Sequence, residues 1–387
     1  MTGSPPFGVY VHVPFCRFRC DYCAFATYTD RDHLMERYAE ACVAEVSRAR
    51  TDEGIPPATS VFFGGGTPSR LPADLLVGIL DAVPRLSGAE VTVECNPEDV
   101  TAERLAAYRT GGVTRVSLGV QSTAPHVLAG LGRRHGSDQA LEAAAMVADA
   151  GFDSWNMDLI MGGAGETDAD WEQSLTDVLS LAKPPPHVSA YALTVEPGTP
   201  LASAPARHPD DDVQADRYAV ADRMLADAGL AWEEISNWAR PGHRCRHNNL
   251  YWDQGEYRGI GSAAHSHRAG RRWWNVRTPD RYLAAVDRGG SAMAAEEVLT
   301  DEQRRFEALA LALRTPSGVP AAALPDGPDL EGLIELRGTR AVLTLRGRLL
   351  ANAVTTRLMP GESARGSMPS GDDRPVAAGT IPPYVRS

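Results

Sequence analysis

Short runs of β-forming residues alternate with longer helical runs from residue 9 to residue 228, and no other feature restricts the fold as strongly. The short runs are rich in branched and aromatic residues, which favour strands. They are Val9–Val13, Ser60–Phe63, Glu90–Glu94, Thr114–Val120, Ser154–Ile160 and His187–Leu193. The helical runs are His33–Arg50, Leu71–Leu86, Thr101–Thr110, Asp138–Ala150, Asp168–Leu181 and Asp211–Ala228. Six βα units in sequence predict a parallel sheet, either doubly wound or a partial barrel, and periodicity does not separate the two.

Composition describes a globular, acidic chain. Of its 387 residues 43% are hydrophobic and 23% charged, with a formal net charge of -12, which indicates one large domain or two unequal ones. No run of about 18 apolar residues is present, and Met1–Gly8 is too short and too rich in Pro and Gly for a secretory signal. We expect a cytoplasmic protein that does not depend on nucleic acid or anionic membrane. Arg268, Arg271 and Arg272 form either a local basic patch or a solvated loop.

Cys16, Cys20 and Cys23 lie within eight residues of one another. Three thiolates from one short loop leave a fourth position open on whatever metal they hold. A structural zinc site needs four ligands; no second CxxC motif follows, although His12 could serve as the fourth. Disulfides are disfavoured because six cysteines in a cytosolic chain of this length is ordinary usage. The spacing therefore favours an iron–sulfur cluster over zinc.

The pattern Cys-x3-Cys-x2-Cys, with Tyr22 before the third cysteine, resembles the signature of the radical S-adenosylmethionine (SAM) enzymes. This resemblance implies a [4Fe–4S] cluster held by Cys16, Cys20 and Cys23, with SAM on its open iron. It also implies the curved, incomplete (β/α)6 barrel of that family, an α/β fold whose chemistry lies at the carboxyl ends of the strands.

Several residues near the predicted strand ends match positions that bind SAM in this family. The Gly64–Pro68 loop follows the second strand, and glycines there let the backbone approach a ligand closely. Glu94 ends the third strand, where a carboxylate is expensive to bury without a partner. By resemblance the SAM ligands are Tyr10, Tyr22, Gly65, Gly66, Thr67, Glu94, Gln121, Arg133 and Asp158. For Arg133 a solvent-facing charge is an equal alternative. Ala164 stands where the family usually has proline, which predicts a more mobile loop.

Longer motifs narrow the resemblance to the oxygen-independent coproporphyrinogen III oxidase family. They are Tyr10–Cys16, Gly64–Pro68, Val116–Ser122, His247–Trp252 and Gly259–Ser266. The oxidase branch has a fourth cysteine two residues after the third, where this chain has Phe25. A second branch, of haem chaperones, lacks that cysteine and carries an HNxxYW motif, present here as His247–Trp252.

The chaperone branch implies that the protein binds haem and passes it to recipient haem proteins. Its implied ligand is His247, with Tyr251 and Trp252 nearby, within a haem-binding segment 243–267. Histidine is a common haem ligand, and aromatic rings pack on a macrocycle. Cys245, His243, His265 and His267 stay open as ligands. Two other functions stay open: a coproporphyrinogen III oxidative decarboxylase, and a non-catalytic zinc or iron–sulfur module. Peripheral association with membrane haem proteins and a homodimer are also left open.

The pattern changes near residue 295. The expected division is an extension 1–8, a barrel 9–295, an appendage 296–359 and a disordered tail 360–387, which is rich in Gly, Ser and Pro. The appendage is predicted to contain helices Thr300–Leu313, Asp329–Leu336 and Arg348–Met359 and a strand Ala341–Leu345. Helices with a small β element resemble a winged-helix-like α+β domain.

Overall fold

The computed structural model describes residues 5–325 and 329–359. The tail predicted for 360–387 and residues 1–4 of the predicted extension 1–8 lie outside the described residues.

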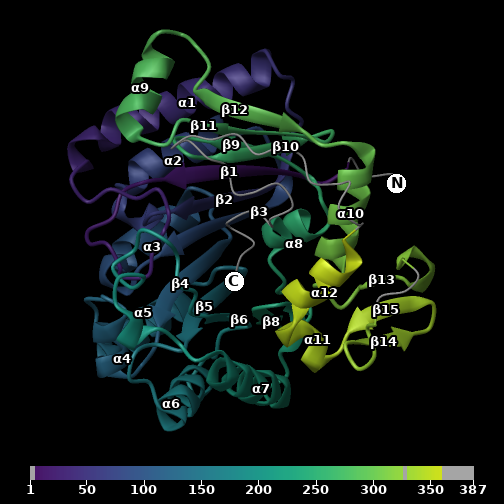
Figure 1. The fold of residues 1–387 in the computed structure, drawn as a ribbon. Coiled ribbons are helices and arrows are strands. Elements are labelled where there is room, and N and C mark those ends of the chain that lie inside the picture. The colour runs from purple at the N-terminus through teal and green to yellow at the C-terminus, as the bar shows by residue number, and fades with distance from the viewer. Residues whose placement is uncertain (1–4, 326–328, 360–387) are drawn as a thin grey trace.

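Six parallel strands form the centre of the fold in chain order. They are β1 (Phe7–Val13), β2 (Ala58–Gly65), β3 (Arg85–Cys95), β4 (Arg115–Gln121), β5 (Ser154–Met161) and β6 (His187–Ala192). Each pairs in parallel with the next; Tyr10 lies opposite Phe62, for example, and Phe62 opposite Thr92. The helices α1 to α7 run along the outside of the curved sheet (Figure 1). The protein therefore has the parallel sheet that the residue pattern predicted, in the partial (β/α)6 barrel form that the family resemblance implied.

The outer helices follow the strands at intervals. They are α1 (Met35–Thr51), α2 (Ala73–Ala82), α3 (Ala102–Thr110), α4 (Pro125–Gly130), α5 (Ser137–Asp149), α6 (Asp168–Leu179) and α7 (Asp211–Asp227). Single 3-10 turns are η1 (Asp32–Leu34), η2 (Pro68–Arg70), η3 (Pro97–Asp99), η4 (Pro205–Arg207) and η5 (Ala321–Ala323). The helix predicted for Leu71–Leu86 is wrong at its end. Pro84 disfavours helical geometry at Val83, so α2 stops at Ala82 and β3 has already begun at Arg85.

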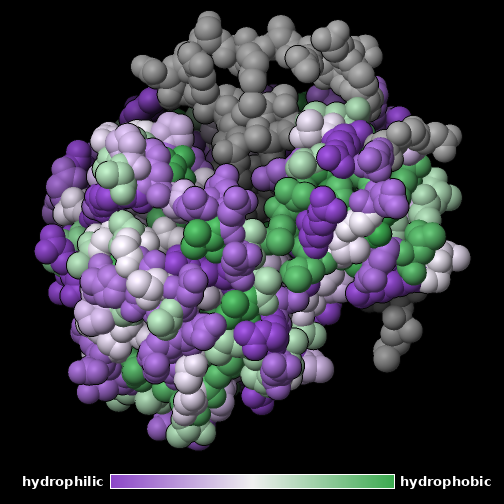
Figure 2. All heavy atoms as spheres, turned by 60° about the horizontal axis from the view of Figure 1, so that its bottom comes forward, coloured by the Kyte–Doolittle hydropathy of each residue, from purple (hydrophilic) through white to green (hydrophobic). Residues whose placement is uncertain are grey.

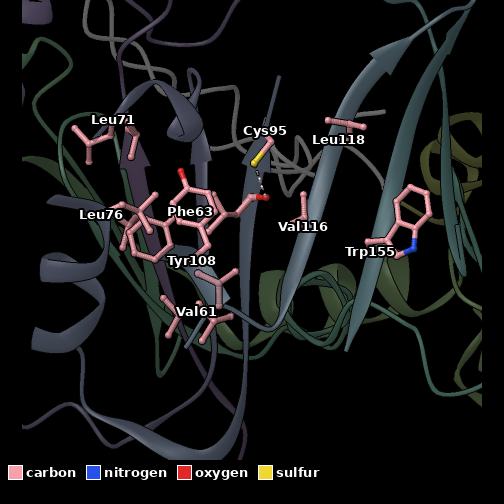
Figure 3. Packing of buried hydrophobic residues seen from close by; sticks show 14 of the residues in the cluster. Val61, Phe63, Leu71, Leu76, Cys95, Tyr108, Val116, Leu118 and Trp155 are labelled. Atoms are coloured by element: carbon pink, nitrogen blue, oxygen red, sulfur yellow. Dashed lines mark hydrogen bonds between the residues drawn. The ribbon is translucent and has the colours of Figure 1, made fainter. Parts of the chain in front are cut away.

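The main core lies between the sheet and these helices. Val61 and Phe63 project outward from β2 and pack near Leu76 of α2 and Tyr108 of α3 (Figure 3). Because side chains alternate along a strand, Phe62 between them faces the barrel interior. Outward positions thus carry the apolar core, and inward positions are left for polar and functional side chains.

Further strands extend the sheet at both edges. An antiparallel hairpin of β7 (Ala231–Glu234) and β8 (Asn237–Ala239) follows β6. On the other side β9 (Glu256–Ile260) runs parallel to β1, and β10 (His265–Arg268), β11 (Arg271–Asn275) and β12 (Met293–Val298) continue antiparallel. Gly259 and Ile260, the first residues of the Gly259–Ser266 motif, therefore belong to a strand. α8 (Arg246–Trp252) and α9 (Pro279–Asp287) are the helices of this region.

A small α+β unit follows β12, which itself spans the expected boundary at residue 295. It contains α10 (Asp301–Ala312), α11 (Leu345–Leu349), α12 (Ala351–Leu358) and an antiparallel sheet of β13 (Val319–Pro320), β15 (Arg340–Leu343) and β14 (Ile334–Arg337). The helix predicted for Asp329–Leu336 is wrong, because Gly338, with φ +64°, closes a hairpin that pairs β14 with β15. The last predicted helix is two short ones. The unit has its own core around Leu313, Leu343 and Val354.

Figure 2 shows apolar residues gathered on the right of the view, over these C-terminal elements. Leu336, Leu345 and Leu349 are among the exposed large apolar side chains of the described residues. Within residues 5–325 and 329–359, none of the helices combines the length and apolar character needed to cross a membrane.

Candidate functional site

The cysteine loop, which carries Cys16, Cys20 and Cys23, follows the carboxyl end of β1, and backbone hydrogen bonds close its base. Cys16 N–H donates to Tyr28 O (3.1 Å), and Tyr28 N–H donates to Pro14 O (2.8 Å). Its far side is fixed to the rest of the barrel through Asp21, whose carboxylate accepts from Arg207 (2.7 Å) and whose carbonyl accepts from Leu201 N–H (2.9 Å). The loop is therefore fixed both at its base and at Asp21 on its far side.

Cys16, Cys20 and Cys23 are reduced and partly exposed on this loop. Burial raises the pKa of the Cys16 thiol to about 11, so a metal must displace its proton on binding. Within the described ranges no three His, Cys, Asp or Glu side chains converge closely enough to hold one metal ion. His12 does not complete such a site, since Nε2 bonds to Ala26 O (3.0 Å) and Nδ1 to the Tyr10 hydroxyl (3.2 Å). The three thiols suit a polynuclear cluster, in which separate cysteines bind separate irons, better than one zinc ion.

The Gly64–Pro68 loop packs directly against the cysteine loop. Gly66 N–H donates to Val13 O (2.8 Å), and Thr67 N–H donates to Phe15 O (2.9 Å). Gly65 has φ +109°, and a Cβ added there would overlap the His12 ring. A Cβ on Gly66 would lie 2.7 Å from Val13 O. The close approach that these glycines permit is thus to the carboxyl end of β1, where the cysteine loop begins. Their predicted contact with SAM stays a prediction.

Glu94 and Asp158 both project into the barrel. Gly65 N–H donates to Glu94 Oε2 (3.3 Å), while Asn156 Nδ2 donates to Asp158 Oδ1 (2.7 Å). Burial, helped by the charge of Asp158, raises the pKa of Glu94 to about 8, and burial also raises the pKa of Asp158. Burial and the nearby Glu94 raise the pKa of Tyr10. This part of the interior is rich in acceptors and suits a ligand that brings a positive charge or N–H groups.

Gln121 is the last residue of β4, and Arg133 reaches the same strand end through Gly119 O. Gln121 is a non-glycine residue with φ +70°, at a register shift between β4 and β5. A positive φ costs energy and often marks a functional position. Arg133 donates from Nη2 to Asn96 Oδ1 and to Gly119 O, both at 2.8 Å. It does not face bulk solvent as a free charge, which was the alternative.

Tyr22 belongs to the cysteine loop, between Cys20 and Cys23. It packs against an apolar cluster that includes Val127, Leu131 and Leu201. Burial, and then the nearby Cys20 thiol, raises the pKa of its hydroxyl, so the Tyr22 ring lies close to the sulfur of Cys20. Its place supports the loop, and a SAM contact stays a prediction.

The HNxxYW segment forms α8 near the amino ends of the strands. Glu90 of β3 accepts from the N–H groups of Arg246 (3.0 Å) and His247 (3.1 Å), which fixes the first turn of the helix. The ring of His247 is fully buried; Nδ1 bonds to Ser60 Oγ (3.0 Å) and Nε2 to the Tyr251 hydroxyl (2.8 Å). Burial lowers the pKa of His247 to about 3. Its imidazole is therefore neutral, and both nitrogens have partners.

The other residues that were open as haem ligands differ in availability. Cys245 is buried and contacts Glu90 (3.6 Å), and His243 Nδ1 bonds to Ser154 Oγ (3.1 Å). His265 stacks on Trp274 with ring centroids 5.7 Å apart. His267 Nδ1 bonds to Gly255 O (2.9 Å), and its buried Nε2 has no hydrogen-bond partner among the described residues. Trp252 packs against Leu311 of α10, so it joins the barrel to the C-terminal unit.

Two features were outside the predicted site. Asn96 bridges Thr67 and Arg133, because Nδ2 donates to Thr67 Oγ1 (3.2 Å) and Oδ1 accepts from Arg133. Its position directly after Glu94 and Cys95 at a strand end was the only signal in the sequence. Arg268, Arg271 and Arg272 each form an ion pair with a glutamate, so that group is charge-compensated.

Comparison with known proteins agrees with this geometry. Residues 10–178 match the Radical SAM superfamily. The chain is 42% identical over 377 residues to a protein named "Heme chaperone HemW" from Mycobacterium tuberculosis, covering 93% of this chain and 96% of the relative. It is 37% identical over 341 residues to the protein of the same name from Synechocystis, covering 84% and 82%.

Among solved structures, coproporphyrinogen III oxidase HemN from Escherichia coli superposes with a TM-score of 0.76 over 92% of this chain and 90% of that chain, at 21% identity. That likeness concerns the fold. The match to relatives along nearly the whole chain decides the family: the chain belongs to the haem chaperone HemW family of the radical SAM superfamily.

Proposed function

We propose that this protein is a haem chaperone that carries a SAM-ligated [4Fe–4S] cluster and delivers haem to recipient haem proteins in the cytoplasm. The observation that carries the proposal is the 42% identity, over 93% of the chain, to a protein named as a haem chaperone. Phe25 in place of a fourth cysteine and the His247–Trp252 motif support the same branch.

Cys16, Cys20 and Cys23 would hold the cluster. When bound, a site-differentiated cluster supplies one-electron chemistry and an open iron for the amino acid end of SAM. Glu94 and Asp158 would receive the positively charged part of SAM, Gln121 and Arg133 its polar groups, and the Gly65–Thr67 backbone would line the path to the cysteine loop.

His247 is the proposed haem ligand. A neutral imidazole is the form that binds iron, and burial keeps this ring neutral. Iron binding at Nε2 requires the Tyr251 hydroxyl to leave that atom, while Ser60 continues to orient the ring through Nδ1. Haem uptake would thus include a rearrangement of α8, with Trp252 nearby.

The test is an optical titration of the anaerobically reconstituted protein with haem, with and without SAM. His247→Ala is expected to weaken haem binding at least tenfold. Tyr251→Phe is expected to bind haem as well as the parent or more tightly, because it removes the competing hydroxyl. His126→Ala, which changes an exposed histidine on α4, serves as the matched control.

Unchanged affinity in His247→Ala would exclude this ligand, and a loss in His267→Ala would then assign the role to the unpartnered Nε2 of His267. Conversion of coproporphyrinogen III to protoporphyrinogen IX by the parent protein would instead identify an oxidase. Light scattering with and without haem tests for the homodimer, and sedimentation with vesicles that contain a haem protein tests for membrane association.

A further inference from the structure

We infer that Arg133 sets the reduction potential of the cluster through the sulfur of Cys20, independently of any contact with SAM. The inference rests on the proposed cluster at Cys16, Cys20 and Cys23. Arg133 is a positioning residue in this role, since it acts on a ligand of the cluster.

The contact itself is between a guanidinium and a cluster cysteine. Arg133 Nη1 donates to Cys20 Sγ at 3.5 Å. A hydrogen bond from a charged donor to a sulfur that carries negative charge is stronger than one between neutral groups. Hydrogen bonds to the sulfurs and net charge are two of the features that set the potential of an iron–sulfur cluster.

Neutral groups fix Arg133 in this position. Nη2 donates to Asn96 Oδ1 and Gly119 O, while the buried Nε finds no acceptor within residues 5–325 and 329–359. Among the residues that the structure describes, no carboxylate lies within ion-pair distance of Arg133, and Glu98 is the carboxylate whose charge acts on it. A mostly buried cation needs negative charge nearby, and thiolates bound to iron would add it in direct contact with the guanidinium.

A second donor reaches the neighbouring cysteine. Thr67 Oγ1 donates to Cys16 Sγ at 3.5 Å and accepts from Asn96 Nδ2. Asn96 therefore holds both donors, the charged one to Cys20 and the neutral one to Cys16. The Nδ2 and Oδ1 atoms of its side-chain amide fix the spacing between Thr67 and Arg133.

The sign of the effect follows from charge. One-electron reduction adds negative charge to the cluster, and Arg133 stabilises the more negative state. Removing its charge makes the cluster harder to reduce. Loss of one charge-assisted hydrogen bond is worth about a factor of ten in the reduction equilibrium, which for one electron is about 59 mV.

The experiment is a potentiometric titration of the reconstituted parent and variants without SAM, followed by the electron paramagnetic resonance signal of the reduced cluster. Arg133→Gln is expected to lower the midpoint potential by about 59 mV. Asn96→Asp keeps the guanidinium but adds a negative charge beside it and is expected to lower the potential too. Arg134→Gln removes an exposed, adjacent arginine that stacks over Phe18 and is expected to leave the potential unchanged.

Iron and sulfide analysis distinguishes a failure of the proposed function from a failure of the inference about Arg133. A parent protein that takes up no cluster would overturn the proposed function. If Arg133→Gln takes up the full amount of iron and its midpoint potential equals that of the parent, the inference is overturned while the proposed function is not. If Arg133→Gln takes up no cluster, Asn96→Asp decides: a lowered potential supports the inference, and an unchanged one refutes it.

Discussion

Gly65→Ala is expected to destabilise the contact between the glycine loop and the cysteine loop. Gly65 has φ +109°, outside the left-handed region that an alanine tolerates, at a cost of about 1–2 kcal/mol. Its new Cβ would also overlap the His12 ring. Forcing an extra methyl into a packed site costs about 1–3 kcal/mol. Together these effects predict a loss of about 2–5 kcal/mol in the free energy of unfolding.

Gly54→Ala is the matched control. Gly54 also has a positive φ, +61°, but a Cβ there would have nothing within 4 Å. Alanine at position 54 therefore carries only the backbone cost of about 1–2 kcal/mol. The comparison removes the ordinary cost of a left-handed φ, so the excess loss at Gly65 measures the overlap with His12 together with the less favourable φ of +109°.

Urea unfolding of the cluster-free protein, followed by tryptophan fluorescence, measures both losses. Adding His12→Ala to Gly65→Ala should recover part of the stability, because the ring that the methyl meets is then absent. Reconstitution of Gly65→Ala should also give less iron per chain than the control. Equal stability of the two alanine variants, with no coupling to His12, would refute the reasoning.

Two further predictions concern the barrel interior. Burial raises the pKa of Glu94 from 4.5 to about 8, so between these pH values the folded protein binds a proton that the unfolded chain has lost, and stability falls as pH rises. The stability of Glu94→Gln relative to the parent should therefore increase from pH 5 to pH 8. Curves of stability against pH that run parallel for the two proteins would contradict this. Gln121→Gly should stabilise the cluster-free protein by about 1 kcal/mol by relieving a positive φ while weakening SAM binding to the reconstituted protein. Gln254→Gly, which relieves φ +52° away from the site, should show the first effect without the second.

The arrangement of the strands was predictable because parallel strands buried on both faces are rich in branched residues. All six predicted strands overlap β1 to β6. The residues at which helices and strands end were harder to predict. Pro84 ended α2 early, and the hairpin at Gly338 replaced a predicted helix, because local residue preferences compete with turns and pairing partners that are distant in sequence.

The roles of single site residues depended on contacts that the sequence does not show. The bridging position of Asn96 requires the ends of β2, β3 and β4 to meet at one edge of the sheet, and the strained backbone of Gln121 has no sequence signature because glutamine rarely adopts a positive φ. The resemblance implied Arg133 as a SAM ligand, and that role stays a prediction. The donation from Arg133 to Cys20, 113 residues earlier in the chain, appears only in the folded structure.

The position of α8 is the largest addition to the sequence-based prediction. His247 bonds to Ser60, near the start of β2, whereas Gly65 at the end of β2 packs on His12 of β1, next to the start of the cysteine loop. Five residues of strand separate these two levels by about 16 Å. Haem bound at His247 and a cluster at the cysteine loop would therefore lie at opposite ends of the barrel. Tyr10, Phe62 and His247 stack in sequence between the two levels, with centroid distances of 6.3 and 5.3 Å. An effect of SAM on haem affinity would have to pass through this inward face, so Phe62→Ala should weaken that effect more than it weakens either binding step alone.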